Sequence, residues 1–259
     1  MKTDQVIGHI VNWLGSYCSK AGLKGFVIGV SGGIDSAVTS TLCAKTAKPV
    51  WALNMPILQN PDQLSLAEKH IEWLGKKYPN VNSATVDLSD LFAAFKKSMP
   101  KSVFDNLAQA NTRSRIRMTT LYAFATHHKM LVVGTGNKVE DFGVGFYTKY
   151  GDGGVDLSPI ADLFKTEVYE LGKNLGIIES IMEAAPTDGL WADNRTDESQ
   201  IGATYEELEW AMSFEIKTGD KDILNPREKE VLEIYRKFNY VNKHKMEPIP
   251  VCMIPLDFK

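Results

Sequence analysis

Cysteine, excess charge and long apolar runs are all scarce in this sequence. Its three cysteines, Cys18, Cys43 and Cys252, lie far apart and form no Cys-x-x-Cys pair, which predicts reduced thiols in a cytoplasmic protein instead of a disulfide framework. The formal net charge of −3 offers no electrostatic attraction to nucleic acid or to an anionic membrane. No apolar run approaches the roughly 18 residues of a membrane span, so we expect neither a signal peptide nor an anchor.

What is present is the composition of an ordinary globular protein. The chain has 259 residues, of which 44% are hydrophobic and 24% are charged. That length suffices for one large domain with a well-buried core, whereas two domains would each be of marginal size. We therefore expect a single domain over residues 1–259.

The most informative segment is GVSGGIDS, from Gly29 to Ser36, which follows an apolar strand-like run. Its glycines let the backbone turn tightly and approach a ligand, and a helix beginning near Ile34 would point its free N–H groups at an anion. No Gly-Lys-Ser/Thr follows, so the segment is not a Walker A loop. Asp35 beside phosphates indicates a bridging Mg²⁺. The alternative is a plain glycine-rich turn between a strand and a helix.

Strand-like and helix-like segments alternate over the first half of the chain. The pattern predicts helices at 6–17, 34–47, 64–78 and about 106–128, and strands at 25–30, 50–57, 83–88 and 130–135. Buried strands separated by helices are typical of an α/β fold with a doubly wound parallel sheet and helices on both faces. Ligands bind such sheets beyond the carboxyl ends of the strands. GVSGGIDS and the GTGN at 134–137 both lie at strand ends, so we expect them to share a site.

Two segments of the second half are too specific in composition to be simple connectors. Residues 137–159 combine glycines with charged and aromatic side chains, which predicts a binding loop. Residues 186–202 place Trp191 among acidic residues and predict either a lid or an ordinary solvated loop. Helices are expected at about 205–217 and 226–240, followed by a proline-punctuated tail that begins at His244.

SGGIDS resembles the phosphate loop of the ATP pyrophosphatases, which cleave ATP to AMP and pyrophosphate. Other motifs resemble the NAD synthetases of the ammonia-dependent kind: NTRSRIRM at 111–118, GTGNKVED at 134–141, the run from Phe146 to Ile178 that includes TKYGDGGVD, APTDGLW at 185–191, and His244-Lys245. The resemblance implies an adenine nucleotide alpha hydrolase-like, Rossmann-like fold. It also implies a two-step reaction: the carboxylate of nicotinate adenine dinucleotide (deamido-NAD) attacks the α-phosphate of ATP, and ammonia then displaces AMP to leave NAD.

The same resemblance implies roles for individual positions. The implied ATP-binding positions are Gly29, Val30, Ser31, Gly32, Gly33, Ile34, Asp35, Ser36, Thr135, Lys165 and Thr187. The implied deamido-NAD positions are Arg115, Lys149, Asp156, His244 and Lys245. Asp35 and Glu140 match the Mg²⁺ ligands, and the family is typically homodimeric. Because the chemistry requires positioning and charge neutralisation, no covalent nucleophile is expected, and Asp35 and Lys165 would stabilise charge.

One departure from the family pattern concerns the metal ligand. The interval from Glu140 to Thr148 is one residue longer than is usual in the family. Either a bulge at a glycine absorbs the extra residue, or Asp141 takes the place of Glu140.

A second open point concerns three arginines that alternate on a predicted helix, Arg113, Arg115 and Arg117. Residues spaced in this way do not share one face of a helix. At least one of them would be a surface charge.

Two rival functions remain compatible with the glycine loop. A tRNA-modifying or thiolating member of the same superfamily would show a basic face or paired reactive cysteines, and the charge of −3 argues against it. A regulator that binds a nucleotide without consuming it would have little use for the second acid or the long loops. Only about 24 residues precede the first predicted strand, so we expect no attached glutaminase domain and free ammonia as substrate, although an amidase on a separate chain stays compatible.

Overall fold

The sheet is parallel and has the strand order β3-β2-β1-β4 in the computed structural model, which describes residues 1–58, 61–186, 196–217 and 224–259. In register, Phe26 pairs with Val50 on one side and with Leu131 on the other. The strands are β1 (Phe26–Gly29), β2 (Val50–Asn54), β3 (Val81–Thr85) and β4 (Leu131–Val132). β1 is therefore central, and the loop that follows it opens at the middle of the sheet's carboxyl edge.

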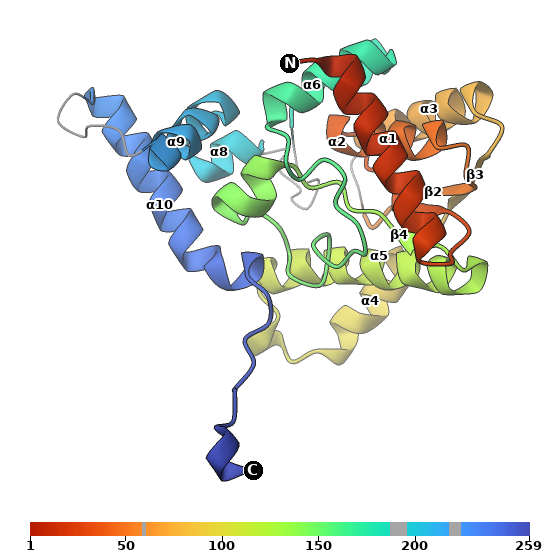
Figure 1. Cartoon of the computed structure of the whole chain (residues 1–259). Helices are drawn as coiled ribbons and strands as arrows, with labels where there is room; N and C mark the ends of the chain where they lie inside the picture. Colours follow the sequence, from red (N-terminus) through yellow and green to blue (C-terminus); the bar gives the residue numbers. More distant parts are fainter. Residues whose placement is uncertain (59–60, 187–195, 218–223) are drawn as a thin grey trace.

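Helices cover both faces of this sheet (Figure 1). They are α1 (Thr3–Lys20), α2 (Ile34–Lys45), α3 (Pro61–Lys77), α4 (Ser89–Ser98), α5 (Asn106–His128), α6 (Lys165–Leu175), α7 (Glu179–Met182), α8 (Asp197–Ile201), α9 (Tyr205–Lys217) and α10 (Pro226–Met246). Phe26 and Ile28 pack with α1, α2 and α6, whereas Val27 packs with α4 and α5. Alternate residues of one strand thus enter two cores, and the predicted doubly wound α/β fold is confirmed.

A third core lies to one side of the sheet, among α8, α9, α10 and a π-helix at Val139–Val144, called η2 (Figure 1). α10 starts with a capping box in which Asn225 and Glu228 exchange side-chain-to-backbone hydrogen bonds, with Pro226 at the first helical position. The single-domain interpretation stays a prediction. No helix among the described residues has the length and apolar character needed to span a bilayer.

The structure corrects several predicted bounds, among them the ends of β2 at Asn54, of β3 at Thr85 and of β4 at Val132, and it adds α7 and α8, which were not predicted. β3 begins at Val81, two residues earlier than expected, because Asn80 already accepts a hydrogen bond from β2. α4 was not predicted at all. α10 continues to Met246, since the first helix breaker is Pro248, so His244 and Lys245 lie on a helix and not in the tail. Two short 3-10 helices complete the described elements, η1 (Lys101–Val103) and η4 (Leu256–Phe258).

Candidate active site

The glycine loop forms an anion cradle at the centre of the carboxyl edge. It runs from the end of β1 to the start of α2, with Gly32 at φ +89° and Gly33 as the extended N-cap. The Ser36 hydroxyl accepts from the Ser31 N–H at 3.2 Å and donates to the Gly33 carbonyl at 2.9 Å. The first N–H groups of α2 have no acceptor within the helix and face the cavity beside the loop. This arrangement suits a phosphate group.

Lys165 joins the two acids that were predicted to hold a metal. The lysine is the first residue of α6 and is 3% exposed. Its Nζ donates to Asp35 Oδ2 at 2.5 Å and to Glu140 Oε1 at 3.1 Å. Burial acts to lower the pKa of Lys165, but the two neighbouring carboxylates outweigh it, and the net effect raises the pKa. The amine therefore stays charged between the two acids.

Tyr205 holds the same oxygen of Glu140, because its hydroxyl donates to Glu140 Oε1 at 2.6 Å. Burial, followed by the nearby acids, raises the pKa of Tyr205, so the phenol remains a donor. Asn137 holds Asp35 in a similar way, with Nδ2 at 3.2 Å from Oδ1. Residues of α2, η2, α6 and α9, together with Asn137 just before η2, thus meet around one ammonium group.

The interval after Glu140 contains the π-helix η2. The hydrogen bonds of a π-helix run from residue i to residue i+5, so its turn is wider than an α-helical turn. η2 ends at Val144, and Gly145 follows in the left-handed conformation with φ +63°. With this geometry Glu140 contacts Lys165. Asp141 also lines the cavity, so the geometry favours Glu140 as the partner of Asp35 and leaves Asp141 beside it.

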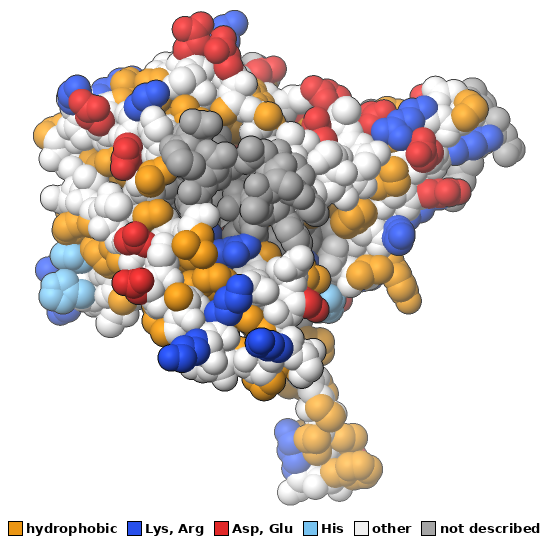
Figure 2. Space-filling model, turned by 180° about the vertical axis from the view of Figure 1, so that it is seen from behind, with side chains coloured by type: hydrophobic (Ala, Val, Ile, Leu, Met, Phe, Trp, Pro, Cys, Tyr) orange, Lys and Arg blue, Asp and Glu red, His pale blue; other side chains and the backbone are white. Residues whose placement is uncertain are grey.

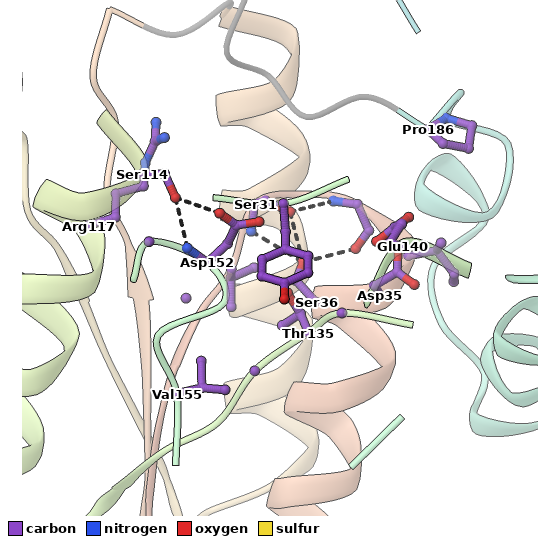
Figure 3. A pocket seen from close by; sticks show the side chains of 18 of the residues that line it. Ser31, Asp35, Ser36, Ser114, Arg117, Thr135, Glu140, Asp152, Val155 and Pro186 are labelled. Carbon is purple, nitrogen blue, oxygen red and sulfur yellow. Dashed lines mark hydrogen bonds between the residues drawn. The ribbon is translucent and has the colours of Figure 1, made fainter. Parts of the chain in front are cut away.

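A cavity of about 260 Å³ connects these groups with the amino-terminal half of α5. In Figure 3, Asp35 and Glu140 lie at one end of the cavity, and Ser114, Arg117 and Asp152 lie at the other. All the predicted ATP-binding positions within the described residues line it except Gly32, and Thr187 lies outside those residues. The ones that line it are Gly29, Val30, Ser31, Gly33, Ile34, Asp35, Ser36, Thr135 and Lys165.

The far end of the cavity contains groups that the sequence motifs did not single out. Arg117 donates from Nε to the Met55 carbonyl at 2.9 Å, while its terminal nitrogens donate to no described residue. Burial, followed by the charge of Arg113, lowers the pKa of Arg117 to about 10. Asp152 accepts from Ser114 Oγ at 2.7 Å and from the Thr148 N–H at 2.9 Å. The position of Asp152 within TKYGDGGVD and that of Arg117 within NTRSRIRM were signals for them, whereas no quoted motif contains Tyr205.

Two acids, Asp141 and Asp152, lie on this wall, and burial favours their neutral, protonated forms. Burial, followed by Glu140 and Asp152, raises the pKa of Asp141 to about 8. Burial also raises the pKa of Asp152. Among the described residues, no group of three or more His, Cys, Asp or Glu side chains could hold a metal ion. A metal here would therefore take its remaining ligands from substrate or water.

Four of the five predicted deamido-NAD positions gather outside the cavity, where α10 ends. Arg115 donates from Nε and Nη2 to the Lys149 carbonyl at 3.3 Å, and Lys149 Nζ donates to the His244 carbonyl at 2.5 Å. Lys245 Nζ donates to the carbonyls of Gly145 and Tyr147, both at 2.8 Å.

The three alternating arginines of α5 lie in different surroundings, as the helical spacing predicted. Arg115 is exposed, Arg117 lines the cavity, and Arg113 lies over the Phe92 ring.

Asp156, the fifth position, lies apart from that group. Its carboxylate accepts from the Val132 N–H at 2.8 Å and from the Tyr122 hydroxyl at 3.0 Å, next to β4. It does not line the 260 Å³ cavity. The deamido-NAD assignments therefore stay predictions, with four residues in one cluster and Asp156 beside the sheet.

Comparison with known proteins agrees with this geometry. A family model described as NAD synthase matches residues 6–248. The chain belongs to the NAD synthase family. Among curated NAD synthase relatives, an NH(3)-dependent NAD(+) synthetase of Methanosarcina mazei is 41% identical over 210 residues, covering 79% of each chain. One of the same name from Methanocaldococcus jannaschii is 36% identical over 260 residues, covering 95% of this chain and 96% of its own.

Two solved structures of the NAD synthase type superpose over nearly the whole length. An NMN synthetase from Francisella tularensis gives a TM-score of 0.85 at 33% identity and covers 99% of each chain. An NH3-dependent NAD synthetase from Campylobacter jejuni gives a TM-score of 0.79 at 25% identity, covering 98% of this chain and all of its own. The predicted family is confirmed.

Proposed function

We propose that this protein makes NAD by ATP-dependent amidation of deamido-NAD with ammonia, releasing AMP and pyrophosphate. It is a ligase that forms a C–N bond, as its family membership indicates. The observation that carries the proposal is the position of Lys165, Asp35 and Glu140 directly beside the anion cradle. This site concentrates charged groups around a phosphate-binding loop and has no need of a covalent nucleophile.

The first step activates a carboxylate, which is a poor acylating agent on its own. The nicotinate carboxylate attacks the α-phosphate of ATP, the α–β bond breaks, and pyrophosphate leaves with the electron pair of that bond. The N–H groups from Gly29 to Ser36 would hold the departing pyrophosphate, and Lys165 would neutralise part of its charge. Since no Walker lysine follows the loop, the cradle suits a leaving pyrophosphate better than a transferred γ-phosphate.

Mg²⁺ fits the carboxylates that the site presents. Asp35 comes from the first turn of α2 and Glu140 from the first turn of η2, and both reach one cationic point, which Lys165 Nζ now occupies. Mg²⁺ ordinarily takes one or two carboxylates and completes its shell with phosphate oxygens and water. When bound, the ion supplies charge neutralisation at the reacting phosphates. Asp35 and Glu140 would hold it.

The second step replaces AMP by ammonia at the activated carbonyl. Ammonia is present in water mostly as ammonium, which must lose a proton before it attacks. The acids Asp141 and Asp152 line this wall and would take up that proton when they are ionised. The homodimeric state and the cytoplasmic location of the enzyme belong to this proposal as well, supported by the family resemblance and by the spacing of the cysteines.

A second candidate is amidation of nicotinate mononucleotide, the corresponding substrate without the adenylate half. It is favoured by the TM-score of 0.85 and the full coverage with the NMN synthetase. Against it, the cations Arg115, Lys149 and Lys245 gather outside the cavity, where they suit the further phosphate of a dinucleotide. The two candidates share the adenylation chemistry and differ only in the size of the acid.

Measuring the products formed from deamido-NAD and from nicotinate mononucleotide tests both candidates. Purified protein with ATP, Mg²⁺, ammonium and deamido-NAD is expected to form AMP, pyrophosphate and NAD in equal amounts, with a higher kcat/KM than for nicotinate mononucleotide. Asp35→Ala should abolish AMP formation, while Asp4→Ala, which removes an exposed carboxylate on α1, should leave it unchanged. A higher kcat/KM for the mononucleotide would select the second candidate, and absence of AMP with either acid would reject both.

A further inference from the structure

The carboxyl-terminal segment leaves the body of the protein as an arm, defined here as residues 247–259 (Figure 1). Residues 248–259 make hydrogen bonds only within the segment, from the Phe258 N–H to the Pro255 carbonyl and from the Lys259 N–H to the Leu256 carbonyl. No side chain beyond Glu247 bonds to the described body. Apart from Glu247, which bonds to Lys243 at the end of α10, the arm has no hydrogen bond to the rest of the described chain.

The arm is apolar although it is surrounded by solvent. Figure 2 shows hydrophobic side chains gathered at its projecting end. Their exposed fractions range from 48% to 88% for Ile249, Val251, Met253, Ile254, Leu256 and Phe258. Burying such side chains stabilises an interface, and contiguous exposed apolar surface marks an interaction site.

Three prolines stiffen the arm before it binds anything. Pro248, Pro250 and Pro255 fix φ at three positions within eight residues. A proline-rich segment stays extended and loses less conformational entropy on docking than a flexible tail would. The arm is thus suited to lie along a surface as an extended strip.

A matching apolar face is present on the same chain. α4, η1 and the start of α5 expose Leu91, Phe95, Val103 and Leu107, with exposed fractions between 42% and 61%. Charges at the edges of the two surfaces are complementary. Lys96, Lys97 and Lys101 accompany the face, while Glu247 and Asp257 outnumber Lys259 on the arm.

We propose that residues 247–259 form an exchanged arm that packs on the Leu91, Phe95, Val103 and Leu107 face of a second copy of this chain. The arm begins at the end of α10, which Lys149 links to Arg115 of α5, and then runs away from its own body (Figure 1). In a two-fold pair, each copy offers one arm and one face, so both apolar surfaces are covered and the assembly closes. The inference does not depend on the reaction proposed above.

Cysteine cross-linking tests the contact directly. Cys252 is exposed, whereas Cys18 and Cys43 are buried, so the arm already carries one accessible thiol. With a short bis-maleimide, Val103→Cys and Leu107→Cys should give a covalent dimer in which Cys252 is joined to the new cysteine. Tyr17→Cys, at an exposed position of α1, should give no such product, and Cys252→Ser should abolish the cross-link to either face position.

Sedimentation measurements on variants show how much the arm contributes to the affinity of the dimer. The double variant Leu256→Asp with Phe258→Asp should weaken the dimer at least tenfold, and Tyr240→Asp, an exposed change on α10 outside the arm, should not. Far-UV circular dichroism should be unchanged in both, because neither set of side chains enters a core. Three results would each overturn the proposal. They are a wild-type protein that sediments as a monomer, a double variant that dimerises as tightly as the wild type, and a cross-link that forms within one monomer.

Discussion

Replacing Lys165 by methionine tests how the charges of the site are held together. The substitution keeps the length of the side chain and removes its charge, leaving Asp35 and Glu140 without the ammonium group between them. The three side chains are 4%, 16% and 17% exposed, so water compensates little. Breaking a buried ion pair by removing one partner costs about 3–5 kcal/mol. We expect the free energy of unfolding to fall by about that amount.

Urea unfolding at pH 7 measures this change, and Lys138→Met is the matched control. Lys138 also forms an ion pair, with Asp162 at 2.9 Å, but those side chains are 29% and 97% exposed. A pair this exposed contributes less than about 1 kcal/mol. AMP formation by Lys165→Met should fall by about 100-fold or more, the equivalent of about 3 kcal/mol of lost charge stabilisation. Equal stabilities for the two variants would refute the reasoning.

Three further predictions concern other described residues. His70 is fully buried, with Nε2 2.9 Å from Ser40 Oγ, and burial lowers its pKa to about 4. Because the unfolded chain then binds a proton more readily below pH 6.5, stability should fall by about 2 kcal/mol between pH 7 and pH 5, and His70→Gln should remove that part of the dependence in urea titrations. Gly145→Ala should destabilise the protein by about 1–3 kcal/mol in the same assay, since φ is +63° and a Cβ would lie 2.4 Å from Asn242 Cβ; an unchanged midpoint would contradict it. Arg117→Met should lower kcat/KM about tenfold or more through loss of a charged contact with an anionic substrate, and wild-type kinetics would remove Arg117 from the site.

The sheet and its main helices could be predicted from periodicity because buried strands and amphipathic helices obey local rules. α5 and α9 have the predicted bounds, Asn106–His128 and Tyr205–Lys217. α4 and the last turns of α10 were missed. α4 buries only Phe92 and follows a strand without a strong turn signal, while α10 exposes much of its final turns, so no apolar pattern marked the extension.

The candidate site also has one part that sequence motifs predict and another part that only the fold brings together. The glycine loop, Asp35 and Glu140 follow motifs and could be predicted from them. The meeting of both acids at Lys165 depends on α6 packing against α2, over a separation of 130 residues between Asp35 and Lys165. Tyr205 and Arg117 reach the site through tertiary packing alone. The π-helix at η2 is likewise outside local pattern rules, which is why the spacing after Glu140 left two interpretations open.

Oxygen transfer from the acid to AMP tests the central claim most directly. If the carboxylate of deamido-NAD attacks the α-phosphate, one carboxylate oxygen must stay on that phosphate when ammonia displaces AMP. With both carboxylate oxygens labelled as ¹⁸O, the account predicts one labelled oxygen in each AMP and none in pyrophosphate, as measured by mass spectrometry. AMP that carries no label, formed together with NAD, would contradict the proposed adenylation.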